Sequence, residues 1–515
     1  MKTKTITTET QRRKEFFHFG PTVIFLSTFV LVSLCLCASV VKISAQETIP
    51  APGAPRSITI PAVKEIKLKN GLTIAVVERK GVPFVTVQLL VRNGANAEDK
   101  KKAGLANLTA SMLTKGTTTK SATQIAEEIE FLGGSIFSFA GWLNSSVGMS
   151  ITSDKFDAAM AILADVSLNP NFTKDELDLA KSQTLDELTY NLTQPGFLAN
   201  YVASSYGFGE HPTGGTPGSI ESMTQVDVSG YYAKNYKPDA SVLIFVGDIT
   251  PEKAAASAEK YFGGWTKPDR ALGKTFDKWG DPIGGAKAAS IPIVRRFLVV
   301  DMPNSGQASV NFVKPVIRVG RKSKEYYPAS VLNSVLGGGY SSRLNQEIRI
   351  KRGLSYGAGS NFLWRGAAAN FGARAQTKDV SAAEVAELII AEIQRLVETD
   401  PTEAELTPRK SVLTGNFGRN LETTQGLAGA IADLYSFGIP TSELNAYMPS
   451  VNGVKNTDIK SFAAANLYDG DLIIVGDYAK FKDDLAKRFP GMKIDVVKAS
   501  ELDIESETLR KSDVR

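Results

Sequence analysis

The chain repeats itself at an offset of 229 positions, and this duplication limits its possible folds more than any other feature. The segments TKDELDLAKS (173–182) and TEAELTPRKS (402–411) share Thr, Glu, Leu, Lys and Ser at the same places. The runs VLIFVGD, ending at Asp248, and LIIVGD, ending at Asp477, are separated by the same offset (477 − 248 = 229). Because this period is far too long for a solenoid repeat, each copy is expected to be a whole domain of about 200 residues.

Both copies carry signals for helices and for strands. Each ten-residue segment opens with Thr followed three residues later by Glu, a pattern that is typical of a helix start. The two VGD runs are typical of buried strands that end in a Gly-Asp turn, and Asn70-Gly71 joins two alternating runs as a β-hairpin. One apolar stripe at helical spacing indicates a core-packing helix: Val385, Leu388, Ile389, Ile393, Leu396 and Val397. The sequence therefore predicts an α+β fold of two tandem homologous domains.

The segment before the first copy has the features of an export signal. After Arg12, Arg13 and Lys14, a long apolar run leads to KISAQE, which offers a cleavage point after Ala45. The run is also long enough to span a bilayer uncleaved, so a membrane anchor stays open as an alternative. Both interpretations place the rest of the chain in the periplasm or outside the cell.

These signals divide the chain into six expected segments. They are a signal peptide or N-terminal anchor (1–45), a Pro-rich tether (46–57), an N-terminal domain (58–262), a linker (263–293), a C-terminal domain (294–500) and a polar tail (501–515).

Rare residue types exclude several kinds of chemistry. Cys35 and Cys37 are the only cysteines, and His18 and His211 are the only histidines. Removal of 1–45 would leave no thiol and one imidazole, which excludes disulfides, thiolate catalysis and a zinc site built on two histidines. The net charge of +5 is spread without a Lys/Arg block, so it does not indicate nucleic-acid binding.

Several motifs together point to one family. They are AGLANLTASMLTKGT (103–117), GEHPTGGTPGSIESM (209–223), YYAKNYKPDASVLIFVGD (231–248) and LGGGYSSRLNQEIRIKRGLSYGAGS (336–360). In these motifs the chain resembles the pitrilysin or insulinase family of zinc metallopeptidases, which includes the mitochondrial processing peptidases. The resemblance covers both halves and implies that each domain is a β-sheet with helices packed on one face. It also implies that the two domains form half of a clamshell.

The resemblance places a degenerate zinc motif on the helix after the strand 85–91. The family carries His-x-x-Glu-His there, and the corresponding residues are Asn107, Ala110 and Ser111. An amide, a methyl group and a hydroxyl cannot replace two imidazoles and a base. The family's third ligand corresponds to Glu187, which alone cannot hold zinc, so we expect no metal and no intact catalytic residue in this chain. His211 corresponds to a His-Pro turn with a structural role.

The second half retains what the resemblance identifies as substrate-binding residues. The family's Arg and Tyr, seven residues apart, correspond to Arg349 and Tyr356, and Arg352 nearby is a second candidate for the arginine. A guanidinium and a phenol can donate hydrogen bonds to a developing oxyanion. Family members of this length pair a zinc-bearing subunit with one that lacks the motif.

Three functions follow as hypotheses. The favoured one is an exported non-catalytic subunit of a heterodimeric zinc peptidase, in which Arg349 and Tyr356 serve the zinc of a homologous partner that acts on peptides. A proteolytically inactive scaffold or peptide-binding protein is the alternative. An enzyme with a remodelled metal site is the third.

Overall fold

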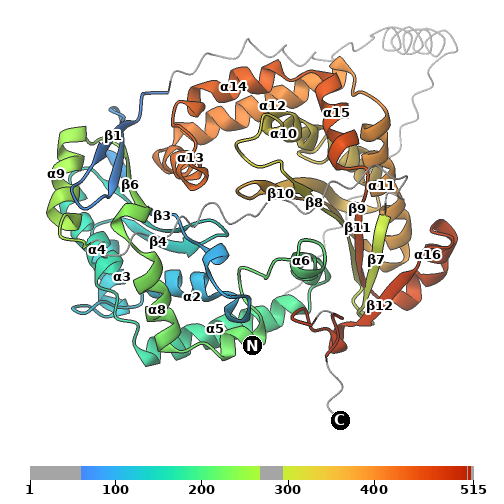
Figure 1. Cartoon of the computed structure of the whole chain (residues 1–515), viewed down its shortest axis with the longest axis horizontal. Helices are drawn as coiled ribbons and strands as arrows, with labels where there is room; N and C mark the ends of the chain where they lie inside the picture. Colours follow the sequence, from blue (N-terminus) through green and yellow to red (C-terminus); the bar gives the residue numbers. More distant parts are fainter. Residues whose placement is uncertain (1–59, 267–293, 507, 512–515) are drawn as a thin grey trace, which may run out of the picture. The chain divides into compact units, whose positions relative to one another are not determined.

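Two six-stranded mixed sheets form the framework of the computed structural model, which describes residues 60–266, 294–506 and 508–511 (Figure 1). The first sheet has the order β1-β2-β6-β3-β5-β4, and the second has the order β12-β7-β11-β8-β10-β9. The strands of the first sheet are β1 (Lys64–Lys67), β2 (Thr73–Glu78), β3 (Phe84–Val91), β4 (Ser135–Ala140), β5 (Ser145–Thr152) and β6 (Ser241–Gly247). Those of the second are β7 (Val294–Asp301), β8 (Gln307–Ile317), β9 (Ser355–Trp364), β10 (Ala368–Lys378), β11 (Gly470–Gly476) and β12 (Ile494–Lys498).

Helices make up most of the remaining described residues. Those of the first half are α2 (Leu105–Met112), α3 (Ala122–Phe131), α4 (Phe156–Leu168), α5 (Lys174–Leu192), α6 (Pro195–Tyr206), α7 (Pro217–Glu221), α8 (Gln225–Asn235) and α9 (Pro251–Phe262). Those of the second half are α10 (Tyr326–Leu336), the π-helical turn η5 (Asn345–Ile350), α11 (Ala382–Glu398), α12 (Glu403–Glu422), α13 (Thr424–Phe437), α14 (Glu443–Gly453), α15 (Asn456–Asn466) and α16 (Lys482–Arg488).

The two sheets share one topology, which confirms the predicted pair of tandem α+β domains. In each sheet one central pair is parallel, β2 with β6 and β7 with β11, and the strands that follow toward β4 or β9 pair antiparallel. The sheets differ only at one edge. Strand β1 forms the predicted hairpin with β2 through Gly71 (φ +96°), whereas β12 comes from the end of the chain and pairs parallel with β7.

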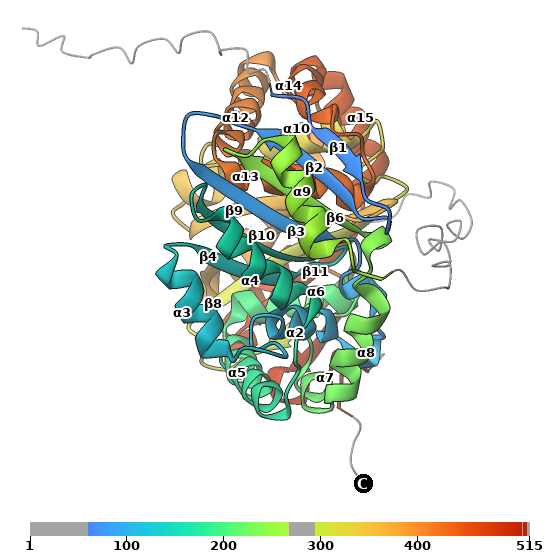
Figure 2. The ribbon, with the colours of Figure 1, turned by 90° about the vertical axis from the view of Figure 1, so that its left-hand side faces the viewer.

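Within each half, the helices of that half cover one face of its sheet. Phe156 of α4 and Ala258 of α9 pack with Ile74 and Phe245 of the first sheet, and these helices lie in front of the strands in Figure 2. In the second half, Ile389 of α11 belongs to a buried cluster together with Val310 and Phe312 of β8. The apolar stripe of α11 is thus a core-packing face, as its spacing predicts.

The opposite face of each sheet receives a helix from the other half. Helix α13 lies against β3 and β6, where Ile431 packs with Ala75 and Ile244 (Figure 1). Helix α6 lies against β8 and β11, where Val202 packs with Val313 and Ile473. Strands β6 and β11 are therefore buried on both faces, which explains their continuous apolar runs.

The exchanged helices are themselves copies of one another. Helix α6 begins at Pro195 and α13 begins at Thr424, again 229 positions apart (424 − 195 = 229). The preceding helices α5 and α12 begin directly after Thr173 and Thr402, as predicted, although only the Thr402 side chain accepts a hydrogen bond, from the Glu405 N–H at 3.3 Å. The duplication therefore includes the exchange of helices between the halves.

The end of the chain differs from the expected polar tail. Ile504 and Leu509 are buried in the cluster that contains α6, and the Ile504 carbonyl accepts a hydrogen bond from Ser205 at 2.9 Å. Ile504 and Leu509 thus pack on the fold, because apolar side chains are interspersed among the charges. The segments expected as signal or anchor (1–45) and tether (46–57), and most of the expected linker (267–293), lie outside the described residues. Among the helices of the described ranges, none is long and apolar enough to cross a membrane.

Candidate functional site

Helix α2 carries the three positions at which the resemblance placed a degenerate zinc motif. Asn107 is exposed, Ser111 is half-buried, and Ala110 is completely buried. The Ser111 hydroxyl donates to the Leu108 carbonyl at 2.8 Å, and the Ala110 carbonyl accepts from the Ser138 hydroxyl of β4 at 2.7 Å. The helix is thus integrated into the fold through its backbone.

Zinc does not fit this set of side chains. Zinc prefers thiolate, imidazole and carboxylate ligands, whereas α2 offers an exposed amide, a buried methyl group and a hydroxyl that is hydrogen-bonded within its own helix. Glu187 lies exposed on α5, which packs beside α2. In the ranges that the structure describes, no group of three or more His, Cys, Asp or Glu residues could hold a metal ion. No catalytic step through a metal is therefore assigned to this chain.

A buried carboxyl group caps the start of α2. Glu98 accepts hydrogen bonds from the backbone N–H groups of Gly104 (2.9 Å) and Ala106 (2.6 Å), and its side chain is 0% exposed. Burial raises the pKa of Glu98 from 4.5 to about 8, and the hydrogen bonds from the helix start only partly oppose this shift. Gly104, at φ +90°, allows the chain to turn into the helix.

His211 lies against this capping group. Its Nδ1 is 3.4 Å from Glu98 Oε1, and burial lowers the pKa of the imidazole. The distance would suit an ion pair, but burial raises the pKa of Glu98 and lowers that of His211, so it disfavours the charged form of both groups. The imidazole also contacts an aromatic ring, because Trp142 packs against it at a tilt of 42°, with ring centroids 5.1 Å apart. This placement agrees with a structural role.

Arg349 and Tyr356, the predicted substrate-binding residues, lie next to each other. The Arg349 guanidinium carbon is 4.8 Å from the ring centroid of Tyr356 and 4.9 Å from that of Tyr340. Both rings are exposed, at 90% for Tyr356 and 64% for Tyr340. Cation–π attraction to two rings holds the guanidinium at the surface, where its N–H groups can reach a ligand. The sequence analysis missed Tyr340, since only the fold brings it beside Arg349.

Arg352 has a different environment, which distinguishes the two arginines. It donates to Glu347 Oε2 at 2.6 Å, and its Nε lies 3.8 Å from Glu384. Arg349 forms no ion pair with any carboxylate of the described chain, and it lies in η5, a π-helical turn of a kind that often marks functional sites. The geometry therefore favours Arg349 as the partner of Tyr356.

The loop that carries Tyr340 is held by a close backbone contact. A Cβ atom on Gly337 would lie 2.1 Å from the Ser360 backbone nitrogen of β9, so only glycine fits there. This loop and β9 carry Tyr340 and Tyr356, so the contact fixes the two rings relative to each other.

The Arg349 cluster and the α2 positions belong to different halves of the chain. Among the described residues, no hydrogen bond, ion pair or ring contact joins Arg349 or Tyr356 to Asn107, Ser111 or Glu187. The two sets of predicted residues therefore do not form one site within a single chain.

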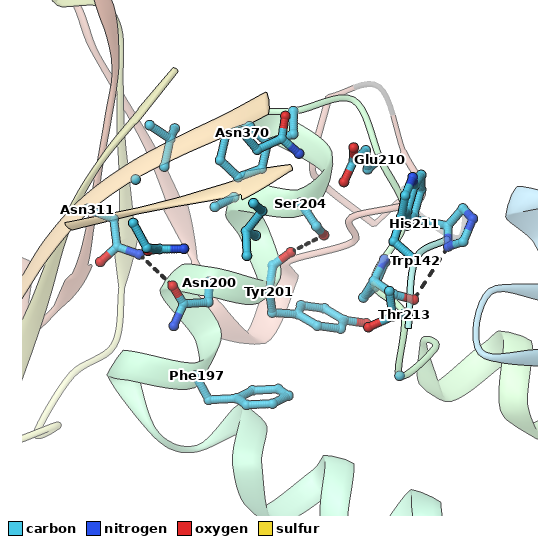
Figure 3. Close-up of a pocket in the computed structure, with 18 of the residues that line it drawn as sticks. Trp142, Phe197, Asn200, Tyr201, Ser204, Glu210, His211, Thr213, Asn311 and Asn370 are labelled. Carbon is cyan, nitrogen blue, oxygen red and sulfur yellow. Dashed lines mark hydrogen bonds between the residues drawn. The ribbon is translucent and has the colours of Figure 1, made fainter. Parts of the chain in front are cut away.

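A cavity between the halves was not anticipated from the sequence. Its wall includes Trp142, which Figure 3 shows beside His211, and the Arg365 guanidinium carbon lies 4.8 Å from the Trp142 ring centroid. Arg365 forms two hydrogen bonds with Glu210, at 2.8 and 2.6 Å. The contact between Arg365 and Glu210 joins residues 155 positions apart, and no local sequence pattern marks it.

Comparisons with known proteins identify the family. Residues 73–204 match the family model described as insulinase (peptidase family M16), and residues 222–413 match the model described as the peptidase M16 inactive domain. An uncharacterized zinc protease of Rickettsia bellii is 28% identical over 298 residues, which cover 57% of this chain and 68% of that protein. One from Bacillus subtilis is 26% identical over 298 residues, with the same coverage.

Two solved structures share the fold. A protein from Pseudomonas fluorescens described as a peptidase M16 inactive domain superposes with a TM-score of 0.69 at 24% identity, covering 80% of this chain and 98% of that one. A protease from Helicobacter pylori gives a TM-score of 0.72 at 20% identity, covering 81% and 99%. Both halves thus match, and the helix that would bear the zinc motif carries Asn107, Ala110 and Ser111 instead. The chain belongs to the insulinase family of peptidases, family M16, as a member with an inactive-type domain.

Proposed function

We propose that this chain is the non-catalytic subunit of a heterodimeric zinc metallopeptidase that acts on peptides outside the cytoplasm. One observation carries the proposal: the chain combines an α2 helix without zinc ligands with an adjacent Arg349–Tyr356 pair at the family's spacing, in which Tyr356 is exposed and Arg349 half-buried. A scaffold that takes no part in turnover would not require Arg349 to pack against the rings of Tyr340 and Tyr356.

The division of labour follows from the separation of the two sets of residues. A homologous partner with an intact His-x-x-Glu-His motif would bind zinc and activate water, and Arg349 and Tyr356 would lie across the interface from that zinc. Their N–H and O–H groups would donate to the oxyanion that develops when water attacks the scissile carbonyl. In this arrangement the chain would form one half of a clamshell and the partner the other.

Export is part of the proposal. The basic residues, the apolar run and the KISA sequence near Ala45 support a mature chain that starts near Gln46, and the uncleaved anchor is the alternative. N-terminal sequencing of the native protein distinguishes the two, since a start at Gln46 supports cleavage and a start at Met1 with membrane association supports the anchor.

Affinity purification of the native protein tests the partnership directly. The proposal expects a stoichiometric partner of the same family that bears His-x-x-Glu-His and co-elutes in gel filtration. Recovery of the chain as a homodimer or monomer without such a partner would favour the alternative of an inactive scaffold or peptide-binding protein.

A further inference from the structure

The cavity between the two halves has the size of a ligand site. It encloses about 730 Å³, within the range of about 300 to 1,000 Å³ that is typical of small-ligand pockets. Figure 3 shows Asn311 and Asn200 on one side of it and Trp142 and Thr213 on the other. Residues of α6, β8, β9 and β10 and the segment after α6 line it, so both halves contribute to its wall.

One wall is a polar sheet face, which is unusual for a position inside a fold. On β10, Phe371 and Ala373 point into the buried core, so by the alternation of a strand Asn370 and Gly372 point to the opposite face, toward the cavity. Gly372 pairs with Asn361 of β9, which also lines the cavity. Amide side chains therefore occupy positions where a purely structural face would carry apolar groups.

Two amides of this wall are hydrogen-bonded to each other. Asn311 donates to Asn200 at 3.1 Å and accepts from Ser309 at 3.1 Å, and Asn200 donates to the Gly196 carbonyl at 2.9 Å. These linked hydrogen bonds hold Asn311 of β8 and Asn200 of α6 in place on one side of the cavity.

Two donors in the wall are unsatisfied. Asn370 is only 5% exposed, yet its Nδ2 has no hydrogen-bond partner within the described part of the chain, and the same is true of the buried Nε1 of Trp142. Leaving a buried N–H group without an acceptor costs free energy, so such groups are rare in native proteins and need an explanation. A ligand with two acceptor atoms would explain them, because it could accept a hydrogen bond from each.

The other features of the wall describe a partly apolar ligand. The charges of Arg365 and Glu210 are paired with each other, whereas Arg374, which also lines the cavity, is exposed. Phe197 and Tyr201 stack with centroids 6.0 Å apart, and Leu363 is 46% exposed, which provides apolar surface beside the donors. An extended polypeptide matches this combination, since it carries an uncharged carbonyl acceptor on every residue between side chains of varied polarity.

We propose that this cavity binds a peptide segment, with Asn370 Nδ2 and Trp142 Nε1 donating to its backbone carbonyls. This inference rests on the proposed function, since it takes peptide as the substrate class. It adds a binding site at the junction of the halves that is separate from Arg349 and Tyr356. The chain would then hold part of a substrate while the reaction takes place at the partner's zinc.

Titration of the purified chain without a partner tests the site. The probe is the blocked peptide acetyl-Ala-Ala-Gln-Ala-Ala-amide, followed by calorimetry and by Trp fluorescence, with tri-N-acetylchitotriose as a carbohydrate of similar polarity. We expect saturable peptide binding that weakens at least 10-fold in Asn370→Leu and several-fold in Trp142→Phe, which keeps the ring but removes the N–H. Asn452→Leu makes the same change at an exposed position and should leave binding unchanged.

A second variant guards against effects on folding. A Cβ atom on Gly372 meets only Asn361 Oδ1, at 3.8 Å, so Gly372→Val should fold, project into the cavity and weaken peptide binding. Asn370→Leu removes an unsatisfied donor, so its thermal midpoint should be unchanged or higher. Three results would overturn the inference: no peptide binding up to 10 mM, binding of the sugar but not of the peptide, or peptide binding by Asn370→Leu and Gly372→Val that equals that of wild type.

The outcome is separable from that of the proposed function. Peptide binding that depends on Asn370, together with no activity on mixing with a zinc-bearing homologue, would retain the site and reject the subunit role. Activity on mixing, with no peptide bound by this chain alone, would retain the subunit role and reject the peptide site in the cavity.

Discussion

The guanidinium carbon of Arg349 lies 4.8 Å from the ring centroid of Tyr356, although the two residues belong to different elements, η5 and β9. Tyr340 lies 4.9 Å from the same guanidinium, so the arginine sits between two exposed rings. The polar ends of Arg349 and Tyr356 are thereby presented at the surface of the second half, where a partner's substrate could reach them.

Removal of either group should slow turnover by the heterodimer without preventing assembly. Tyr356→Phe deletes one hydroxyl, and loss of an oxyanion donor typically lowers kcat by about 10² to 10³. Arg349→Ala should do the same and raise KM if the guanidinium also holds the substrate before reaction. Steady-state kinetics of the mixed subunits provides the measurement.

Matched controls exist in the same cluster. Tyr340→Phe keeps the ring that contacts Arg349, and Arg352→Ala removes an arginine that is already paired with Glu347. Both should leave kcat within about 3-fold, a difference well below one kcal/mol. Equal losses in Arg352→Ala and Arg349→Ala would show that the assignment of Arg349 is wrong.

Metal analysis should find almost no zinc in this chain. With Ala110 buried and Ser111 hydrogen-bonded to Leu108, α2 offers no set of zinc ligands, and we expect less than about 0.1 zinc per chain after dialysis. Mass spectrometry of the digested protein measures the content. Stoichiometric, tightly bound zinc would contradict the account and favour the hypothesis of an enzyme with a remodelled metal site.

The buried Glu98 should make stability depend on pH. The pKa of Glu98 is raised from its ordinary value of 4.5 to about 8 in the folded chain. Between pH 4.5 and pH 8, the folded chain therefore keeps a proton on Glu98 that the unfolded chain has released. Its contribution to stability is therefore fully present below pH 4.5 and is lost as the pH rises to about 8. Each pKa unit corresponds to about 1.36 kcal/mol, so wild type should lose about 2–4 kcal/mol relative to Glu98→Gln between pH 5 and pH 8.

Urea unfolding at both pH values measures this difference. Burial lowers the pKa of His211, which acts in the opposite direction, but His211 is present in both proteins and its effect largely cancels in the comparison. Glu187→Gln changes an exposed helix residue in the same way and should show no such trend. A constant difference between wild type and Glu98→Gln would mean that Glu98 is charged throughout.

The exchange of α6 and α13 between the halves should make the described fold unfold as one unit. Ile431 of α13 is 0% exposed and packs on the first sheet, so Ile431→Ala should cost about 2–5 kcal/mol. Val226→Ala, at a 78% exposed position, should cost less than about 0.5 kcal/mol. Two separate urea transitions, with only one shifted by Ile431→Ala, would show that the halves are independent.

Local features of the fold were predictable, whereas contacts between the halves were not. The hairpin at Gly71 and the buried strands β6 and β11 follow from short patterns in the sequence. The apolar stripe of a helix indicates that it packs, but not on which sheet, so the exchange of α6 and α13 was unforeseen. Residues 501–515 were predicted as a polar tail because charges dominate the segment, although Ile504 and Leu509 are buried against the fold.

The residues of the candidate site likewise fall into those that the sequence predicts and those that it does not. The spacing of Arg349 and Tyr356 and the replaced ligands on α2 are visible in the sequence once the family is suspected. Tyr340, Glu98, Trp142 and Asn370 were not found, because their roles depend on contacts between distant segments and on burial. Such contacts leave no periodicity and no motif.

Peptide hydrolysis by mixed subunits tests the central claim most directly. Each purified chain is assayed alone and after mixing with its zinc-bearing homologue, with gel filtration to establish assembly. The account predicts no hydrolysis by this chain alone, strong activation on mixing, and a loss of kcat of about 10² or more when this chain carries Tyr356→Phe. An intact heterodimer whose turnover is the same with wild type, Tyr356→Phe and Arg349→Ala would contradict it.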